Sequence, residues 1–207
     1  MRLTPLLLAV LAGCGRSDVI DDEPPVSTQK PIAACTSTCT GVPSGVQTPL
    51  ATTSTGLPAH WLTCAGCVRV SFEGLSPSDA LTLLSTVKDW QRAAGESLCL
   101  KLDTSASSDF TDTDRRRIHV TPGESVRSVI TYSVVTGELL HARVEFGKDL
   151  SIERQLVMGM GRALGLTTGE EGVSAVTFRA EGLVEPGPAD VASLRAMYGE
   201  KAWCSPR

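Results

Sequence analysis

The sequence lacks an excess of positive charge and has few histidines. Its formal net charge is -4 at pH 7 over 207 residues, so it has no electrostatic footprint for nucleic acid. It contains no G-x-S-x-G motif, the strand-to-helix turn that presents a serine nucleophile in many hydrolases. Its three histidines, His60, His119 and His141, lie far apart in the chain. These absences argue against nucleic-acid binding and against a serine hydrolase of that kind.

The first 14 residues have the layout of a secretory signal. Met1-Arg2 carries a positive charge, and the apolar stretch from Leu3 to Leu11 is far shorter than the roughly 20 residues that span a bilayer. Leu11-Ala-Gly-Cys14 resembles the lipobox of bacterial lipoproteins, which implies removal of residues 1–13 and lipidation of Cys14. The alternative is an ordinary signal peptide. Acyl chains such as palmitate would give stable membrane anchoring.

The residue after the lipidated cysteine indicates a location. In the Gram-negative sorting rule that the lipobox resemblance brings with it, aspartate at that position favours the inner membrane, and this chain has Gly15. We therefore expect a lipid-anchored protein of the outer membrane, facing the periplasm or the cell surface. Its expected partners are the membrane, through the lipid, and a protein or peptide ligand, with no nucleic acid.

Six cysteines remain after the lipidation site, and an even number in an exported chain predicts disulfides. Six cysteines allow 15 pairings, and a Cys99–Cys204 bridge, which would close a large loop, is one candidate. Cys64-Ala-Gly-Cys67 could be a redox pair or half of a zinc site, but no second C-x-x-C follows, so a structural bridge is favoured. The candidates are Cys35, Cys39, Cys64, Cys67, Cys99 and Cys204.

Composition divides the mature chain into two parts. Residues 14–60 are rich in Ser, Thr, Pro and Gly and have no sustained apolar periodicity, so we expect a disordered, lipidated tether. Residues 61–207 carry the patterns of a folded α+β domain. Strands are predicted at 68–72, 98–102, 117–120, 129–135 and 139–146, and helices from Ser76 to Gly95, from Ser151 to Gly165 and from Pro188 to Gly199.

The second predicted helix carries a recognisable motif. The segment from Leu156 to Thr168 resembles the metzincin signature H-E-x-x-H-x-x-G-x-x-H, and Gly161 and Ala163–Leu166 match the G-H-A-L-G-L of matrixin-type metalloproteases. The flanking helices also resemble that family. The resemblance implies a twisted mixed sheet packed with two or three helices. The alternative is an amphipathic helix whose similarity is accidental.

The residues at the chemical positions of this motif differ from the family. Met158, Arg162 and Thr168 stand where the resemblance places the three zinc-binding histidines, and Gly159 stands in place of the catalytic glutamate. A thioether is a poor zinc ligand, a guanidinium stays protonated, and glycine carries no base. We therefore expect no metal, no other cofactor and no catalysis.

Two further expectations concern neighbours of this helix. We expect Arg162 to form a salt link with Glu170 or Glu171 in the volume where the metal would sit. The segment from Val173 to Phe178 lies where the resemblance places the Met-turn, with Thr177 in place of its methionine.

The sequence leaves three functions open. The first is an inactive metzincin-like domain that binds a peptide along an exposed strand, with His141, Arg143, Val144 and Glu145 as contact residues. The second is an active zinc-dependent endopeptidase with a rebuilt metal site. The third is a structural lipoprotein of the cell envelope, which the sequence does not separate from the first.

Overall fold

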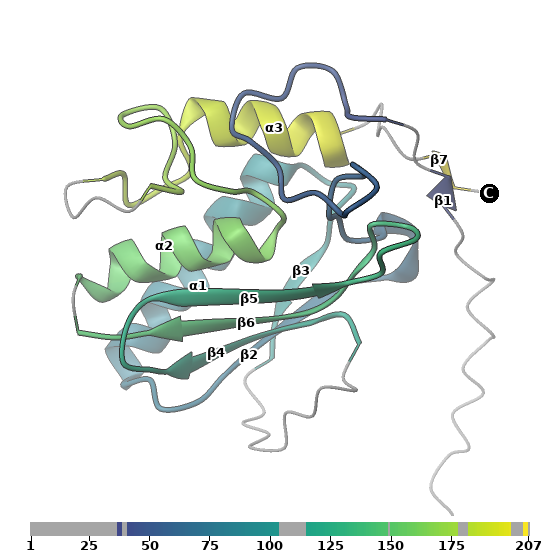
Figure 1. Cartoon of the computed structure of the whole chain (residues 1–207). Coiled ribbons are helices and arrows are strands. Elements are labelled where there is room, and N and C mark those ends of the chain that lie inside the picture. Colours follow the sequence, from purple (N-terminus) through teal and green to yellow (C-terminus); the bar gives the residue numbers. More distant parts are fainter. Residues whose placement is uncertain are drawn as a thin grey trace, which may run out of the picture. The chain divides into compact units, whose positions relative to one another are not determined.

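A computed structural model describes residues 37–38, 41–103, 115–148, 150–177, 182–199 and 205–206. All of them belong to one compact unit, Ile32–Arg207. The fold is α+β, with a five-stranded mixed sheet and three α-helices (Figure 1). Among the helices of the described residues, none is long and apolar enough to cross a membrane. The fold class agrees with the sequence prediction.

The elements follow one another in the predicted order. The helices are η1 (Thr63–Ala65), α1 (Pro77–Ala94), α2 (Ile152–Ala163) and α3 (Pro188–Tyr198). The strands are β1 (Ser37–Thr38), β2 (Val68–Phe72), β3 (Leu100–Leu102), β4 (Arg117–Pro122), β5 (Arg127–Tyr132), β6 (Leu139–Phe146) and β7 (Ser205–Pro206). The short strands β1 and β7 pair with each other, outside the main sheet.

Local capping signals explain where the helices begin. The Ser76 hydroxyl accepts a hydrogen bond from the Asp79 backbone N–H at 3.2 Å at the start of α1. The Ser151 hydroxyl accepts one from the Arg154 N–H at 3.3 Å at the start of α2. Each bond satisfies an N–H that has no partner within its helix. Gly95 follows the end of α1 with a φ of 85°, a conformation that glycine adopts without steric cost.

The strand order corrects one sequence prediction. The order in the sheet is β3-β2-β4-β6-β5, and only β5 runs antiparallel to its neighbour. Strand β6, with the predicted contact residues His141, Arg143, Val144 and Glu145, therefore lies between β4 and β5 and cannot accept another strand. The edge strand beside it is β5. The alternation of apolar and polar residues in β6 reports its two faces, and it does not distinguish an interior strand from an edge strand.

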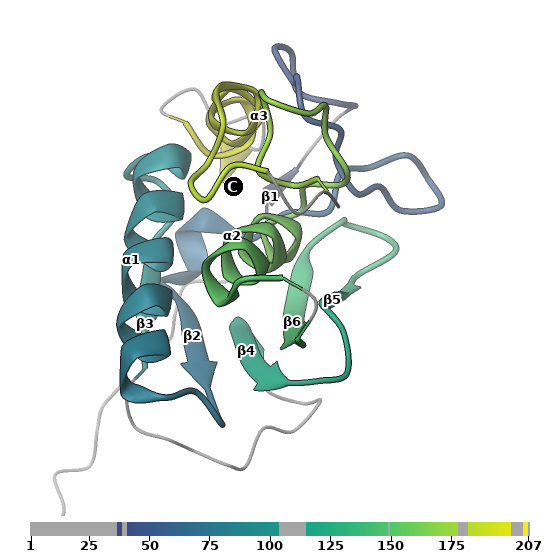
Figure 2. The same ribbon diagram turned by 90° about the vertical axis from the view of Figure 1, so that its left-hand side faces the viewer.

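Helices α1 and α2 cover the same face of the sheet (Figure 2). The Trp90 indole N–H of α1 donates to the Val157 carbonyl of α2 at 3.1 Å, and the Trp90 side chain is fully buried. A Cβ at Gly161 would lie 2.6 Å from Val176 and 2.8 Å from the Trp90 ring. Glycine at position 161 therefore permits the close contact between α1 and α2.

The folded unit begins earlier than the sequence predicts. Residues 41–60 were assigned to the tether, but Thr48 and Ala59 are fully buried. The Ala51 N–H donates to the Gly165 carbonyl at 2.8 Å, and two backbone N–H groups of this segment donate to the Ser193 hydroxyl of α3. The composition of this segment does not predict these hydrogen bonds, because most of them are made by backbone groups. Earlier in the predicted tether, Ser37–Thr38 form β1, and residues 14–36, 39 and 40 lie outside the described residues.

A disulfide joins Cys67 to Cys99, with their Cα atoms 4.4 Å apart. It links the chain just before β2 to the chain just before β3, and these two strands are parallel neighbours. Both pairings favoured by the sequence, Cys99 with Cys204 and Cys64 with Cys67, are therefore wrong. Spacing along the chain did not show that residues 67 and 99 begin adjacent strands. Cys14, Cys35, Cys39 and Cys204 lie outside the described residues.

Removing this disulfide should destabilise the domain. The bridge closes a segment with a sequence separation of 32, so the Cys67→Ser/Cys99→Ser double variant should lose about 3 kcal/mol of unfolding free energy. Urea denaturation followed by tryptophan fluorescence measures the loss, and peptide mapping without reductant verifies the pairing. A double variant as stable as the wild type would contradict this assignment.

Adding one methyl group at Gly161 should also destabilise the domain. The Gly161→Ala variant forces Trp90 or Val176 to move, and the cost exceeds the gain in helix propensity, for a net loss of about 1–2 kcal/mol. Ser85→Ala, at an exposed position of the helix α1, is the control and should be neutral or slightly stabilising. The pair is compared by urea denaturation. Equal stability of the two variants would mean that α1 and α2 are less closely packed.

Candidate functional site

In the resembled family four positions carry the chemistry. In this chain two of them, Met158 and Gly159, lie in tightly packed surroundings. The side chain of Met158 is fully buried. A Cβ at Gly159 would lie 2.3 Å from Val144 Cγ1 of β6, so a glutamate at that position would clash with the sheet. The residues at these positions therefore offer neither a good zinc ligand nor a base, and they do not fit a catalytic zinc centre.

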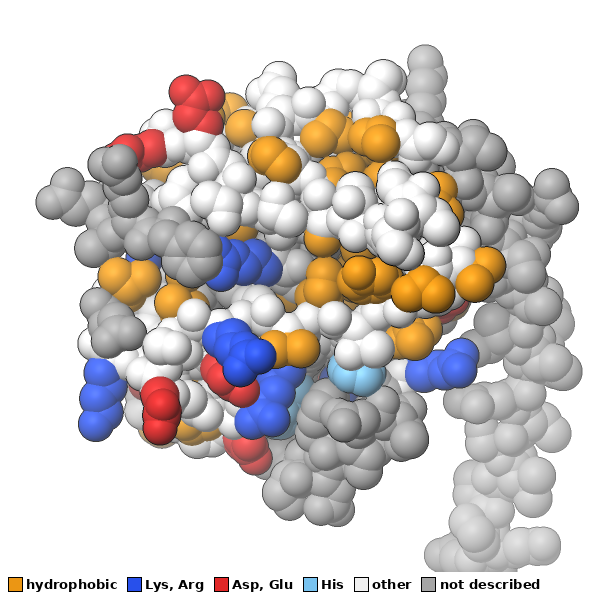
Figure 3. Space-filling view, in the orientation of Figure 1, with side chains coloured by type: hydrophobic (Ala, Val, Ile, Leu, Met, Phe, Trp, Pro, Cys, Tyr) orange, Lys and Arg blue, Asp and Glu red, His pale blue; other side chains and the backbone are white. Residues whose placement is uncertain are grey.

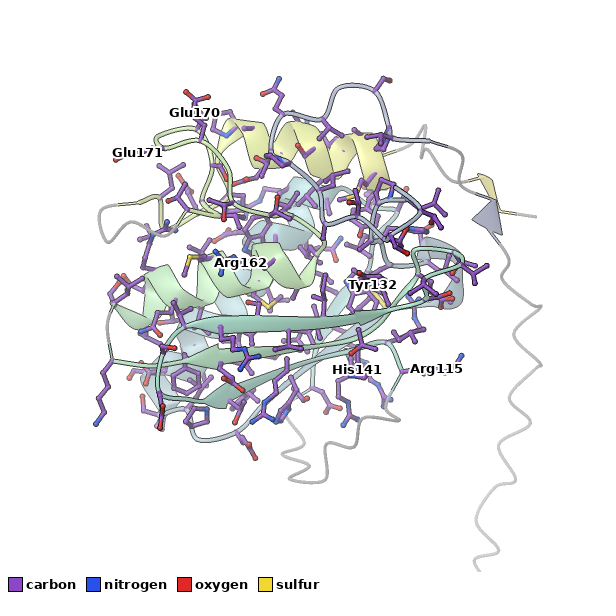
Figure 4. The ribbon with its side chains drawn as sticks, viewed as in Figure 1. Arg115, Tyr132, His141, Arg162, Glu170 and Glu171 are labelled. Carbon is purple, nitrogen blue, oxygen red and sulfur yellow. A yellow bond between two sulfur atoms is a disulfide. The ribbon has the colours of Figure 1, made fainter. Side chains whose placement is uncertain are left out.

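The other two positions, Arg162 and Thr168, line an open pocket of about 260 Å³. The pocket lies between the C-terminal end of α2, the loop that follows it and the edge strand β5. We call it the α2–β5 pocket. In Figure 4 the side chain of Arg162 lies on α2 above β5, and in Figure 3 hydrophobic side chains gather on this face of the molecule. The lining residues are Ala51, Ser128, Ile130, Arg162, Leu166, Thr167 and Thr168.

The walls of the pocket come from three separate parts of the chain. Leu50 forms an isolated antiparallel bridge with Leu166, and the Thr167 N–H donates to the Pro49 carbonyl at 2.8 Å. These bonds hold the segment that contains Ala51 against the loop after α2. On the opposite side, the Ser128 hydroxyl of β5 donates to the Gly159 carbonyl of α2 at 3.3 Å. The contribution of Ala51 could not be expected from a sequence interpretation that assigned it to the tether.

Burial and a like charge act on the guanidinium of Arg162. Burial, and then the positive charge of Arg154, lower the pKa of the Arg162 guanidinium. Glu170 and Glu171 are exposed, and Figure 4 shows them on the loop beyond α2, away from Arg162. The expected salt link between Arg162 and one of these carboxylates stays a prediction. Arg162 brings a positive charge to the wall of the pocket.

Arg154 is a structural residue that the sequence interpretation missed. Its side chain is 1% exposed and donates to the carbonyls of Thr177 and Leu183, each at 2.8 Å, to the Thr177 hydroxyl at 2.6 Å and to the Ala175 carbonyl at 2.5 Å. Burial lowers its pKa, and the charge of Asp190 opposes that effect. Arg154 thereby holds the segment that contains Thr177 on α2. An arginine in an amphipathic helix is ordinarily interpreted as solvent-facing, so no sequence signal identified it.

Asp190 holds the same segment from the side of α3. Its fully buried carboxylate accepts hydrogen bonds from the hydroxyls of Thr48 and Ser174 at 2.8 Å and 2.6 Å. It also accepts from the backbone N–H groups of Ala175 and Gly187 at 2.6 Å and 3.0 Å. Four donors stabilise the buried charge. From the sequence this residue could only be assigned to the first turn of the helix predicted from Pro188.

The three histidines occupy separate environments. His60 is buried, and its Nδ1 lies 2.9 Å from the Pro58 carbonyl. His119 Nδ1 lies 3.0 Å from the Ser71 hydroxyl, and its Nε2 lies 3.6 Å from a Glu73 carboxylate oxygen. His141 Nε2 lies 2.9 Å from the Thr131 hydroxyl. Among the residues that the structure describes, no group of three or more His, Cys, Asp or Glu side chains could hold a metal ion.

Comparisons with known proteins give one distant likeness. No protein-family model matches the chain, and no curated protein matches it. Two solved structures of myroilysin, a metzincin, are distantly similar. One has a TM-score of 0.36 and 16% identity over 53% of this chain and 52% of that one, so this chain spans about half of its length. The other has a TM-score of 0.32 and 15% identity over 81% and 71% of the two chains. At these scores the likeness carries no argument about activity.

Proposed function

We propose that this protein is a lipid-anchored lipoprotein of the outer membrane whose metzincin-like domain binds an extended peptide without cleaving it. The observation that carries the proposal is the α2–β5 pocket, which is open although the residues at the chemical positions do not fit zinc catalysis. Arg162 and Thr168 line this pocket, while Met158 is buried and Gly159 is pressed against the sheet. The arrangement has room for a ligand and lacks the groups for metal-assisted hydrolysis.

The edge strand beside the pocket supplies the mode of binding. Strand β5 is the last strand of the sheet on that side, and two of its residues, Ser128 and Ile130, line the pocket. An edge strand offers backbone N–H and C=O groups to an extended peptide, and neighbouring pockets select its side chains. This replaces β6, which the sequence had suggested as the peptide-binding strand.

Filling the pocket should abolish peptide binding. Thr168 is exposed at the rim, so Thr168→Trp should block the pocket while leaving the fold intact. Ser85→Trp adds the same side chain to the exposed face of α1 and is the matched control. Binding of a fluorescein-labelled randomised hexapeptide mixture is followed by fluorescence anisotropy. The proposal fails if the wild type binds no peptide or if the two variants bind equally well.

Metal content and proteolysis separate this proposal from an active protease. The oxidised domain, purified without chelators, should contain close to no zinc and should not cleave the peptide mixture, because the donor set does not suit the metal. Elemental mass spectrometry and mass-spectrometric product analysis measure the two properties. One zinc per chain together with cleavage would support the alternative, a zinc-dependent endopeptidase with a rebuilt metal site.

Replacing the lipidation residue should release the protein from the membrane. Cys14→Ser removes the only thiol that the lipobox offers for acylation, so the variant should move from the membrane pellet to the soluble fraction and lose labelling by an alkyne analogue of palmitate. Ser85→Ala, at an exposed position of α1, is the control that leaves the lipobox intact. Density-gradient separation of inner and outer membranes tests the location of the wild type. Unchanged membrane association of Cys14→Ser would rule out this anchor.

A further inference from the structure

Polar side chains on the wall of the α2–β5 pocket already have partners within the protein. The Ser128 hydroxyl donates to the Gly159 carbonyl at 3.3 Å, and the Thr167 hydroxyl donates to the Pro49 carbonyl at 3.1 Å. The Arg162 guanidinium also interacts with another group of the protein. A ligand therefore gains little by presenting a charge or a hydrogen-bonding group to these three side chains.

The backbone of the same wall is hydrogen-bonded as well. The Ala51 N–H donates to the Gly165 carbonyl at 2.8 Å, and the Leu166 N–H donates to the Gly161 carbonyl at 3.1 Å. The apolar side chains of the lining are those of Ala51, Ile130 and Leu166. Such a wall favours an apolar group, because burying one removes apolar surface from water and leaves no polar group without its partner.

The edge of β5 shows how an apolar group is brought to the pocket. Among the strands that the structure describes, β6 is the one neighbour of β5. Main-chain donors and acceptors along such an edge can pair with an extended peptide, and a lipid acyl chain has no groups to pair with them. Ser128 and Ile130 are two residues apart on β5 and both line the pocket. A peptide paired with β5 would therefore direct alternate side chains to this face of the sheet.

A charged side chain suits this pocket less well than an aliphatic one. An ammonium or a guanidinium would meet the positive charge of Arg162, to which Arg154 already adds a like charge. A carboxylate would lose its hydration and would have to compete with the carbonyls that Ser128 and Thr167 already bind. An aliphatic side chain has neither cost.

We propose that the α2–β5 pocket selects peptides by one uncharged aliphatic side chain, that of leucine, isoleucine or valine, while the peptide backbone pairs with the edge of β5. This rests on the proposed peptide-binding function and specifies its ligand. The aliphatic side chain packs against Ala51, Ile130 and Leu166. The residues before and after it in the peptide point to the other face of the sheet, so the pocket reads one position.

The test compares peptides that differ at one position. Fluorescein-labelled hexapeptide amides carry leucine, alanine, glutamate or lysine at the fourth position, and serine or threonine at random elsewhere. Fluorescence anisotropy with the wild-type protein should show the leucine peptides binding at least about tenfold more tightly than the alanine peptides, because leucine buries more apolar area. The glutamate and lysine peptides should bind no more tightly than the alanine peptides.

The outcomes separate this inference from the proposed function. Equal binding of the leucine and alanine peptides would overturn the aliphatic selection and leave peptide binding standing. Tightest binding of the glutamate or lysine peptides would also overturn it, since the pocket would then recognise a charge. No binding of any of the four peptides would overturn both proposals.

Two variants of β5 test whether the pocket is the source of the preference. Ile130→Thr replaces part of the apolar wall by a hydroxyl on a side chain of similar shape, so the ratio of leucine to alanine affinity should fall at least about threefold. Val129→Thr makes a similar exchange at the next residue, which is 40% exposed and pairs with Arg143 on the other face of the sheet. It is the matched control and should keep the wild-type ratio whatever its overall affinity. Circular dichroism verifies that both variants are folded.

A third variant fills the pocket from the other wall and leaves β5 unchanged. Ala51 is half-buried on the lining, so Ala51→Leu adds three carbon atoms where the peptide side chain would pack. The leucine peptides should lose affinity and the alanine peptides should keep theirs, which brings the ratio toward one. A wild-type ratio in both Ile130→Thr and Ala51→Leu would place the selection outside this pocket and overturn the inference.

Discussion

The close approach of α2 to the sheet and to α1 is the constraint on which the rest of the domain depends. It is possible because positions 159 and 161 carry no side chain. Val144 of β6 occupies the space beside Gly159, while Trp90 and Val176 occupy the space beside Gly161. The Trp90 indole then reaches the backbone of α2 and donates to it. Two glycines within one helix cost about 1 kcal/mol each in helix propensity, and this close contact offsets that cost.

The close approach of α2 to the sheet also limits which side chain can stand at position 159. A glutamate at position 159 would have to displace Val144, so the helix cannot keep its present distance from the sheet and also carry the base that the resembled family uses. Buried hydrogen bonds hold the surrounding scaffold together. Arg154 and Asp190 hold the segment around Ala175 from two helices. The Trp61 N–H donates to the Tyr198 hydroxyl, which in turn donates to the Leu164 carbonyl, and burial raises the pKa of that tyrosine.

The sequence predicted the parts of the fold that are encoded locally. The helix starts at Ser76 and Ser151, the glycine stop after α1 and the strand at residues 68–72 are each signalled within a few residues, and the structure agrees with them. It could not predict relations between distant segments. The interior place of β6, the Cys67–Cys99 pairing and the burial of Ala59 all depend on which strands become neighbours. The burial of polar side chains such as Arg154 could not be predicted either, because their hydrogen-bond partners lie on other segments.

Arg162 limits the chemistry that the α2–β5 pocket can carry out. A guanidinium holds its protons at neutral pH and offers no lone pair, so it can neither coordinate a metal ion nor act as a general base. The neighbouring positions are limited by packing as well: Met158 is buried, and a Cβ at Gly159 would lie 2.3 Å from Val144. Placing a glutamate at position 159 would therefore also require a smaller side chain at position 144 of β6.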